Sequence, residues 1–151
     1  MLHLIRTSKV RADFIHRGER KKRMEKERVA MNSEGVRRNI LGFMYAERLK
    51  SVLIIAGQLL DVLADINEGE RSGGLKMFGS FVRGVGNEMK LAANVMGGSD
   101  WDGLSGQLNL MEGYARLGQL EAARQELSQT LSRVTTMGGR AMATLEKAGF
   151  L

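Results

Sequence analysis

The chain has 151 residues, of which 43% are hydrophobic, and its 23 lysines and arginines outnumber its 17 aspartates and glutamates. This length suffices for one domain with a hydrophobic core. The absence of cysteine excludes disulfides and thiolate sites, and the absence of proline, with only 5% aromatic residues, favours helices over sheets. The composition therefore predicts an all-α protein.

The positive charge is concentrated towards the N-terminus. Residues 1–50 hold 14 lysines and arginines against 6 acidic residues, whereas residues 51–151 hold 9 against 11. A basic segment of this kind predicts a polyanionic partner, either an anionic membrane surface or nucleic acid. Residues 1–5 form too short an apolar run for a signal peptide, so we expect a cytoplasmic protein.

Residues 1–17 predict a basic amphipathic segment that contacts a membrane. Their apolar residues recur at helical steps beside cations, a pattern that suits the bilayer interface, although the start of an ordinary bundle helix is the alternative. A cluster of cations at residues 20–23 follows, as a candidate for phosphate contact or as a solvated helix face. The predicted membrane or polyanion contacts are Leu2, Leu4, Ile5, Arg6, Lys9, Arg11, Arg17, Arg20, Lys21, Lys22 and Arg23.

Residues 18–68 predict a helical hairpin. Asn32-Ser33-Glu34-Gly35 is typical of a point where one helix ends and another begins, with Ser33 as the N-cap. A short connection of this kind implies that the two helices run antiparallel. The second helix should be the most buried in the protein around residues 52–57, where apolar residues surround it almost completely. Its length of about 50 Å would make the protein elongated.

Two or three further helices are predicted after a break at residues 68–74. The third helix covers residues 73–96 and ends at Gly97-Gly98. Residues 100–151 predict a fourth helix and, after Gly138-Gly139, a short terminal helix. Gly118 is a candidate position for a bend or break in the fourth helix. We expect all of these helices to belong to one domain.

The sequence shows no constellation of catalytic or metal-binding residues. His3 and His16 lie apart from any pair of carboxylates at ligand spacing. Asp61 and Asp65 share a helix face but lack the Glu-x-x-His partner of a di-metal site, which favours a solvated face. We therefore expect no enzymatic activity, no cofactor and no metal.

Four stretches of the chain, in this order, carry a family resemblance. They are the basic amphipathic opening, residues 35–38 with 43–52, residues 81–89, and residues 110–112 with 120–127. Together they resemble the ESCRT-III family, in particular its archaeal cell-division (CdvB-type) branch. The resemblance implies a rod made of the helical hairpin, from which the third and fourth helices open to pack on neighbouring subunits. The implied subunit-interface residues are Phe78, Phe81, Val85, Met89, Leu120, Leu127 and Leu131.

The resemblance implies a physical rather than a chemical function. Copies of the protein would assemble into an open filament that binds anionic membrane and remodels or constricts it. The implied partners are further copies of the chain, an anionic lipid membrane on whose inner face the protein lies peripherally, and a Vps4-like AAA ATPase. Two alternatives remain open: a sequence-nonspecific nucleic-acid-binding helical protein, and a plain helical adaptor whose charge only keeps it soluble. Phe14 is the only aromatic residue before Phe43, which disfavours base stacking.

Overall fold

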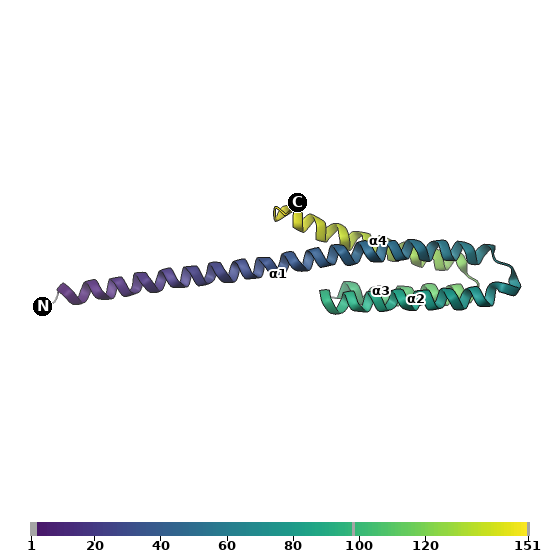
Figure 1. The fold of residues 1–151 in the computed structure, drawn as a ribbon, viewed down its shortest axis with the longest axis horizontal. Helices are drawn as coiled ribbons and strands as arrows, with labels where there is room; N and C mark the ends of the chain where they lie inside the picture. Colours follow the sequence, from purple (N-terminus) through teal and green to yellow (C-terminus); the bar gives the residue numbers. More distant parts are fainter. Residues whose placement is uncertain (1–2, 98, 151) are drawn as a thin grey trace. The chain divides into compact units, whose positions relative to one another are not determined.

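The computed structural model describes the backbone of residues 3–97 and 99–150 and the side chains of residues 19, 22–23, 33–97 and 100–150. Four helices account for most of these residues: α1 (His3–Asp65), α2 (Glu68–Met96), α3 (Ser99–Arg116) and α4 (Leu120–Lys147) (Figure 1). No strand occurs among the described residues, so the all-α prediction is confirmed. We expected a single domain, but the chain divides into two units, residues 1–37 and residues 38–151.

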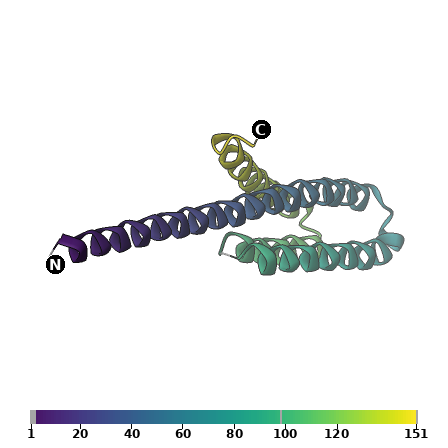
Figure 2. The same ribbon diagram turned by 60° about the vertical axis from the view of Figure 1, so that its left-hand side comes forward.

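The second unit is a four-helix bundle in which consecutive helices run antiparallel (Figures 1 and 2). Gly42 of α1 lies against Met96 at the end of α2, whereas Gly74 near the start of α2 lies against Leu63. These contacts give α1 and α2 opposite directions. The contacts between α2 and α3, and between α3 and α4, likewise join helices that run in opposite directions. Helix α4 also packs antiparallel to α1.

The core of the bundle is built from apolar residues that recur every three or four positions on each helix, the spacing that places them on one face. The run at residues 52–57 was predicted to be buried almost all round, and that prediction is wrong. Leu53 and Ala56 are buried, but Ile54 and Ile55 are 49% and 43% exposed. The largest fully buried apolar side chains are Leu49, Leu53, Leu60, Met89, Leu104, Leu108, Met111 and Val134.

The helical hairpin predicted for residues 18–68 is not formed, because α1 continues as one helix through residues 32–35. Ser33 is therefore not an N-cap, and Gly35 does not adopt the positive φ that ends a helix. A glycine inside a helix costs only about 1 kcal/mol relative to alanine, and neighbouring helix-forming residues offset that cost. The first hairpin is instead made by residues 38–65 of α1 with α2, which are joined at Ile66-Asn67.

Helix α2 begins at Glu68, earlier than predicted, because Gly69, Gly73 and Gly74 are helical rather than part of a loop. A Cβ atom on Gly74 would lie 2.9 Å from Leu63 Cδ2, so this glycine allows α1 and α2 to approach closely after their short connection. The predicted end of this helix at Met96 is confirmed. Gly97 caps it with a φ of 62°, and its N–H donates to the carbonyl oxygen of Ala93 at 2.8 Å.

The C-terminal third of the chain contains two long helices that are separated at Gly118, the position flagged for a bend or break. Gly118 has a φ of +74°, and the N–H of Gln119 donates to the carbonyl oxygen of Tyr114 at 2.9 Å, as in a Schellman cap. The predicted separate terminal helix is wrong, because α4 continues through Gly138 and Gly139 to Lys147. A Cβ on Gly138 would lie 3.0 Å from Ala46 Cβ, so this glycine brings α4 close to α1 rather than ending a helix.

The cap at Gly118 leads to a stability prediction. Because only glycine adopts a φ of +74° without steric cost, Gly118→Ala should lower the free energy of unfolding by about 1–2 kcal/mol. The control is Gly113→Ala, at an exposed helical position with open space around it, which should raise stability by up to about 1 kcal/mol. Urea denaturation of both variants measures the difference. Equal shifts in the two variants would contradict the break between α3 and α4.

Candidate functional site

The two units differ sharply in charge. Residues 1–37 contain 11 lysines and arginines against 5 acidic residues, a net charge of +6, whereas residues 38–151 contain 12 of each. The whole net charge of the protein therefore resides in the N-terminal unit, and the folded bundle is neutral. Any long-range attraction to a polyanion has to originate in the first 37 residues.

The predicted polyanion contacts lie on the N-terminal part of α1, apart from Leu2, which is outside the described residues. The structure describes two of their side chains, Lys22 and Arg23, and both are exposed. The side chains of the others are outside the described part of the chain, although their backbone is helical: Leu4, Ile5, Arg6, Lys9, Arg11, Arg17, Arg20 and Lys21.

The predicted subunit-interface residues lie inside the bundle. Phe78, Val85, Met89 and Leu127 are buried in its core. The remaining three, Phe81, Leu120 and Leu131, are partly buried and pack against that core. In this conformation all seven stabilise the bundle itself, so contacts to a neighbouring subunit through them require the bundle to open.

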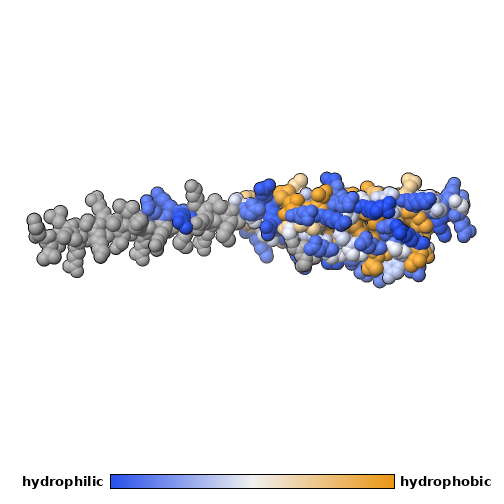
Figure 3. All heavy atoms as spheres, turned by 90° about the horizontal axis from the view of Figure 1, so that it is seen from below, coloured by the Kyte–Doolittle hydropathy of each residue, from blue (hydrophilic) through white to orange (hydrophobic). Residues whose placement is uncertain are grey.

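A different apolar surface is exposed on α1. Ile40, Met44, Ile55 and Val62 are between 43% and 60% exposed, and their spacing places them along one side of the helix, opposite the buried side. Single exposed apolar residues are ordinary, but a row of them on one helix is a common feature of contact surfaces. The face of the bundle shown in Figure 3 carries apolar patches among hydrophilic side chains.

The bundle also contains a basic groove between α2 and α3, with a volume of about 550 Å³. We use "basic groove" for the site lined by Arg71, Ser72, Lys76, Ser80, Arg83 and Arg116. Ser72, Lys76, Ser80 and Arg83 recur at helical steps along one flank of α2, Arg71 belongs to the first turn of the same helix, and Arg116 comes from the last turn of α3. Sequence reasoning missed the groove, because each cation alone resembles an ordinary solvated residue.

One carboxylate holds two of the arginines at the basic groove. Glu112 Oε1 lies 2.6 Å from Arg116 Nη2 and 3.7 Å from Arg83 Nη1, and the Glu112 side chain is only 13% exposed. A Cβ on Gly79 would lie 2.8 Å from the same carboxylate oxygen, so the glycine leaves room for Glu112 against α2. Arg83 Nη2 also donates to Ser80 Oγ at 2.9 Å.

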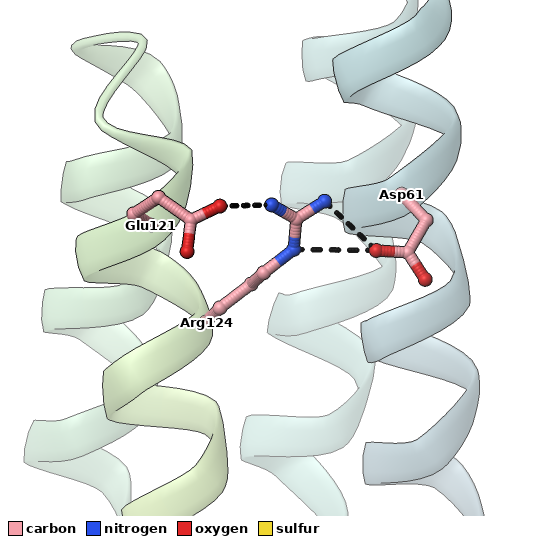
Figure 4. Close-up of polar contacts among 3 residues, drawn as sticks. All are labelled: Asp61, Glu121 and Arg124. Atoms are coloured by element: carbon pink, nitrogen blue, oxygen red, sulfur yellow. Dashed lines mark hydrogen bonds and ion pairs between the residues drawn. The ribbon is translucent and has the colours of Figure 1, made fainter.

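A second charged cluster joins α4 to α1 (Figure 4). Arg124 donates to Asp61 Oδ1 from Nε at 3.2 Å and from Nη2 at 2.8 Å, and it also bonds to Glu121. The hydrogen bonds raise the pKa of Arg124, and the bond to Asp61 has a larger effect than the bond to Glu121. Because an arginine is charged at any physiological pH, this cluster is a structural clamp and not a pH switch. Asp61 therefore pairs with Arg124 rather than lying on a merely solvated face with Asp65.

In the part of the chain that the structure describes, no three histidine or acidic side chains lie close enough together to hold a metal ion. None of the described helices has an apolar stretch long enough to cross a bilayer. The expectation that the protein is not an enzyme stays a prediction.

The chain matches no protein-family model, no curated protein and no solved structure at a significant level.

Proposed function

We propose that this protein binds anionic membrane surfaces through the N-terminal part of α1 and assembles on them as an ESCRT-III-like filament. The observation that carries the proposal is the separation of charge, with a net charge of +6 on residues 1–37 and none on residues 38–151. The same segment contains the apolar residues Leu2, Leu4 and Ile5. Cations beside apolar residues on a helix are typical of segments that lie in the bilayer interface.

The expected energetics favour binding by an array rather than by single molecules. Each lysine or arginine near an anionic leaflet contributes about 1 kcal/mol, and the attraction falls off within a Debye length. One copy would therefore bind modestly and reversibly. Copies linked to one another bind far more tightly, because every further contact with the surface is intramolecular.

Assembly needs a surface that one copy presents to the next. The seven residues implied by the family resemblance are occupied within the bundle, so they support assembly only in an opened form. The exposed row Ile40, Met44, Ile55 and Val62 is the alternative contact that the closed bundle offers. Contacts that repeat without closing on themselves produce a filament.

Binding to nucleic acid is the second candidate function, because the same cations would contact phosphates. Such binding would have little sequence preference and would weaken steeply as salt increases. The N-terminal segment contains apolar residues but almost no aromatic ones for base stacking. This composition fits a lipid surface better than a nucleic acid.

A triple variant separates the two functions. Leu2, Leu4 and Ile5 changed to serine should reduce sedimentation with vesicles containing phosphatidylserine at least tenfold, because apolar insertion is lost while every cation remains. Binding to duplex DNA should stay within twofold. The matched control changes three exposed leucines of the bundle, Leu91, Leu110 and Leu117, to serine and should leave both activities unchanged.

Electron microscopy of the unmodified protein on the same vesicles tests the assembly. Filaments or coats on anionic vesicles, absent from phosphatidylcholine vesicles, are the expected result. Bare vesicles beside decorated DNA would replace the membrane proposal with the nucleic-acid one. Vesicle binding without any ordered coat would retain the membrane proposal and reject the filament.

A further inference from the structure

The basic groove between α2 and α3 is distinct from the charged N-terminal unit. It lies wholly within the bundle, whose charges otherwise balance at 12 basic and 12 acidic residues. Four of those basic residues, Arg71, Lys76, Arg83 and Arg116, line this one groove. A local excess of cations in a neutral domain marks a place where an anion is attracted at short range.

The acidic residue at the groove does not neutralise it. Glu112 is shared by Arg83 and Arg116, so one negative charge faces two guanidinium groups. For Arg71 and Lys76, no ion pair is found within the part of the chain that the structure describes. Counted as formal charges, the four basic residues and Glu112 together give the groove a net charge of +3.

An unsatisfied donor lies at the same place. Arg71 Nε is buried and has no hydrogen-bond partner among the described residues. Because Arg71 Nε has almost no solvent-accessible surface, an anion in the groove would contact Arg71 through its terminal guanidinium nitrogens rather than through Nε. An arginine presents its N–H groups as a planar fork, whose preferred partners are carboxylate and phosphate oxygens.

Neutral donors complete the set. Ser72 and Ser80 are exposed and lie on the groove wall. Ser80 Oγ accepts a hydrogen bond from Arg83, which leaves its own proton available for an anion. Three guanidinium groups, one ammonium and two hydroxyls supply many more donors than a single carboxylate accepts, whereas a phosphate group accepts several bonds on each of its oxygens.

We propose that the basic groove is a binding site for a small anion that carries one or two phosphate groups. Its volume of about 550 Å³ is within the range of small-molecule sites, about 300–1,000 Å³. Arg71 and Lys76 bind the anion with charges that no protein carboxylate occupies, and Arg83 and Arg116 approach it from the rim, held by Glu112. The site does not depend on the membrane function proposed above, because it lies in the bundle and not in residues 1–37, and soluble pyrophosphate alone tests it.

Calorimetry with pyrophosphate on the full chain tests the site. The double variant Arg71→Gln/Lys76→Gln removes two charges without breaking any ion pair among the described residues, and its affinity for pyrophosphate should fall at least tenfold. The charge-matched control, Lys90→Gln/Lys147→Gln, changes two exposed lysines away from the groove and should stay within twofold. If the double variant does not fold, as judged by its thermal unfolding, Lys76→Gln alone should still reduce affinity about threefold.

A vesicle-binding experiment distinguishes a lipid headgroup from a free phosphate compound as the source of the phosphate group. Phosphatidylcholine vesicles with a phosphorylated inositol lipid are compared with vesicles of equal charge made with phosphatidylserine. A loss confined to the inositol-lipid vesicles in the double variant identifies a lipid headgroup, and unchanged vesicle binding identifies a free phosphate compound. Equal loss of pyrophosphate affinity in the double variant and its control, or no pyrophosphate binding by the unmodified protein, overturns the proposal. The Leu2, Leu4 and Ile5 variant affects vesicles only, so the two proposals fail independently.

Discussion

Leu53→Ala should lower the free energy of unfolding by about 2–5 kcal/mol, the largest stability loss that we expect for a single truncation in this protein. Leu53 has no exposed surface and lies in the core of the bundle, on the segment of α1 that faces the other helices. Removing its branched side chain forfeits the transfer free energy and leaves a cavity that the surrounding helices fill only in part.

The matched control is the next residue, Ile54→Ala, in the same apolar run. Ile54 is 49% exposed, so its truncation should change stability by no more than about 0.5–1 kcal/mol, and the better helix propensity of alanine offsets part of the loss. Denaturation by guanidinium chloride gives both values. Losses of similar size at the two positions would mean that this run is buried all round, as its composition suggested, and would contradict the packing of α1 in the bundle.

The contrast between these neighbours shows how much of the fold the sequence contains. Helix content, the end of α2 at Gly97 and the break at Gly118 could all be predicted, because they depend on local chemistry. Which side of a wholly apolar run faces the core could not, because that depends on where the other helices lie. An apolar residue is required on the buried side of a helix but is also tolerated on the exposed side.

Glycines caused the remaining errors, since one residue type has two physical uses. Gly118 ends a helix because its φ is positive, whereas Gly74 and Gly138 stay helical and let another helix approach. The local sequence around Gly138-Gly139 resembles a helix end as closely as the sequence around Gly118 does. Only the partner helix distinguishes the two uses, and no proline is present to mark real ends.

The candidate sites divide in the same way. The charge of residues 1–37 is a local property that can be counted directly from the sequence. The basic groove is not local, because Arg116 joins residues of α2 more than 30 positions away only after α2 and α3 have packed. The spacing of Lys76 and Arg83 on one flank of α2 was the available signal, and without Arg116 it does not stand out from a solvated face.

Gly138→Leu should destabilise the protein by about 1–3 kcal/mol, because the new side chain would have to enter the contact between α4 and α1. A Cβ at this position already comes within 3.0 Å of Ala46 Cβ, and the rest of a leucine needs the two helices to separate. That separation would also weaken the clamp between Arg124 and Asp61 on the same pair of helices.

The adjacent glycine provides the control. Gly139→Leu adds the same side chain where nothing lies within 4 Å, and the gain in helix propensity of about 1 kcal/mol should make this variant more stable than the unmodified protein. Thermal and chemical unfolding should therefore move in opposite directions for two substitutions one residue apart. If both variants were stabilised, α4 would not pack on α1 at Gly138. If both were destabilised equally, the two glycines would end a helix, because either substitution disturbs a local break. A contact between helices is instead disturbed only by the substitution on the side of α4 that faces α1.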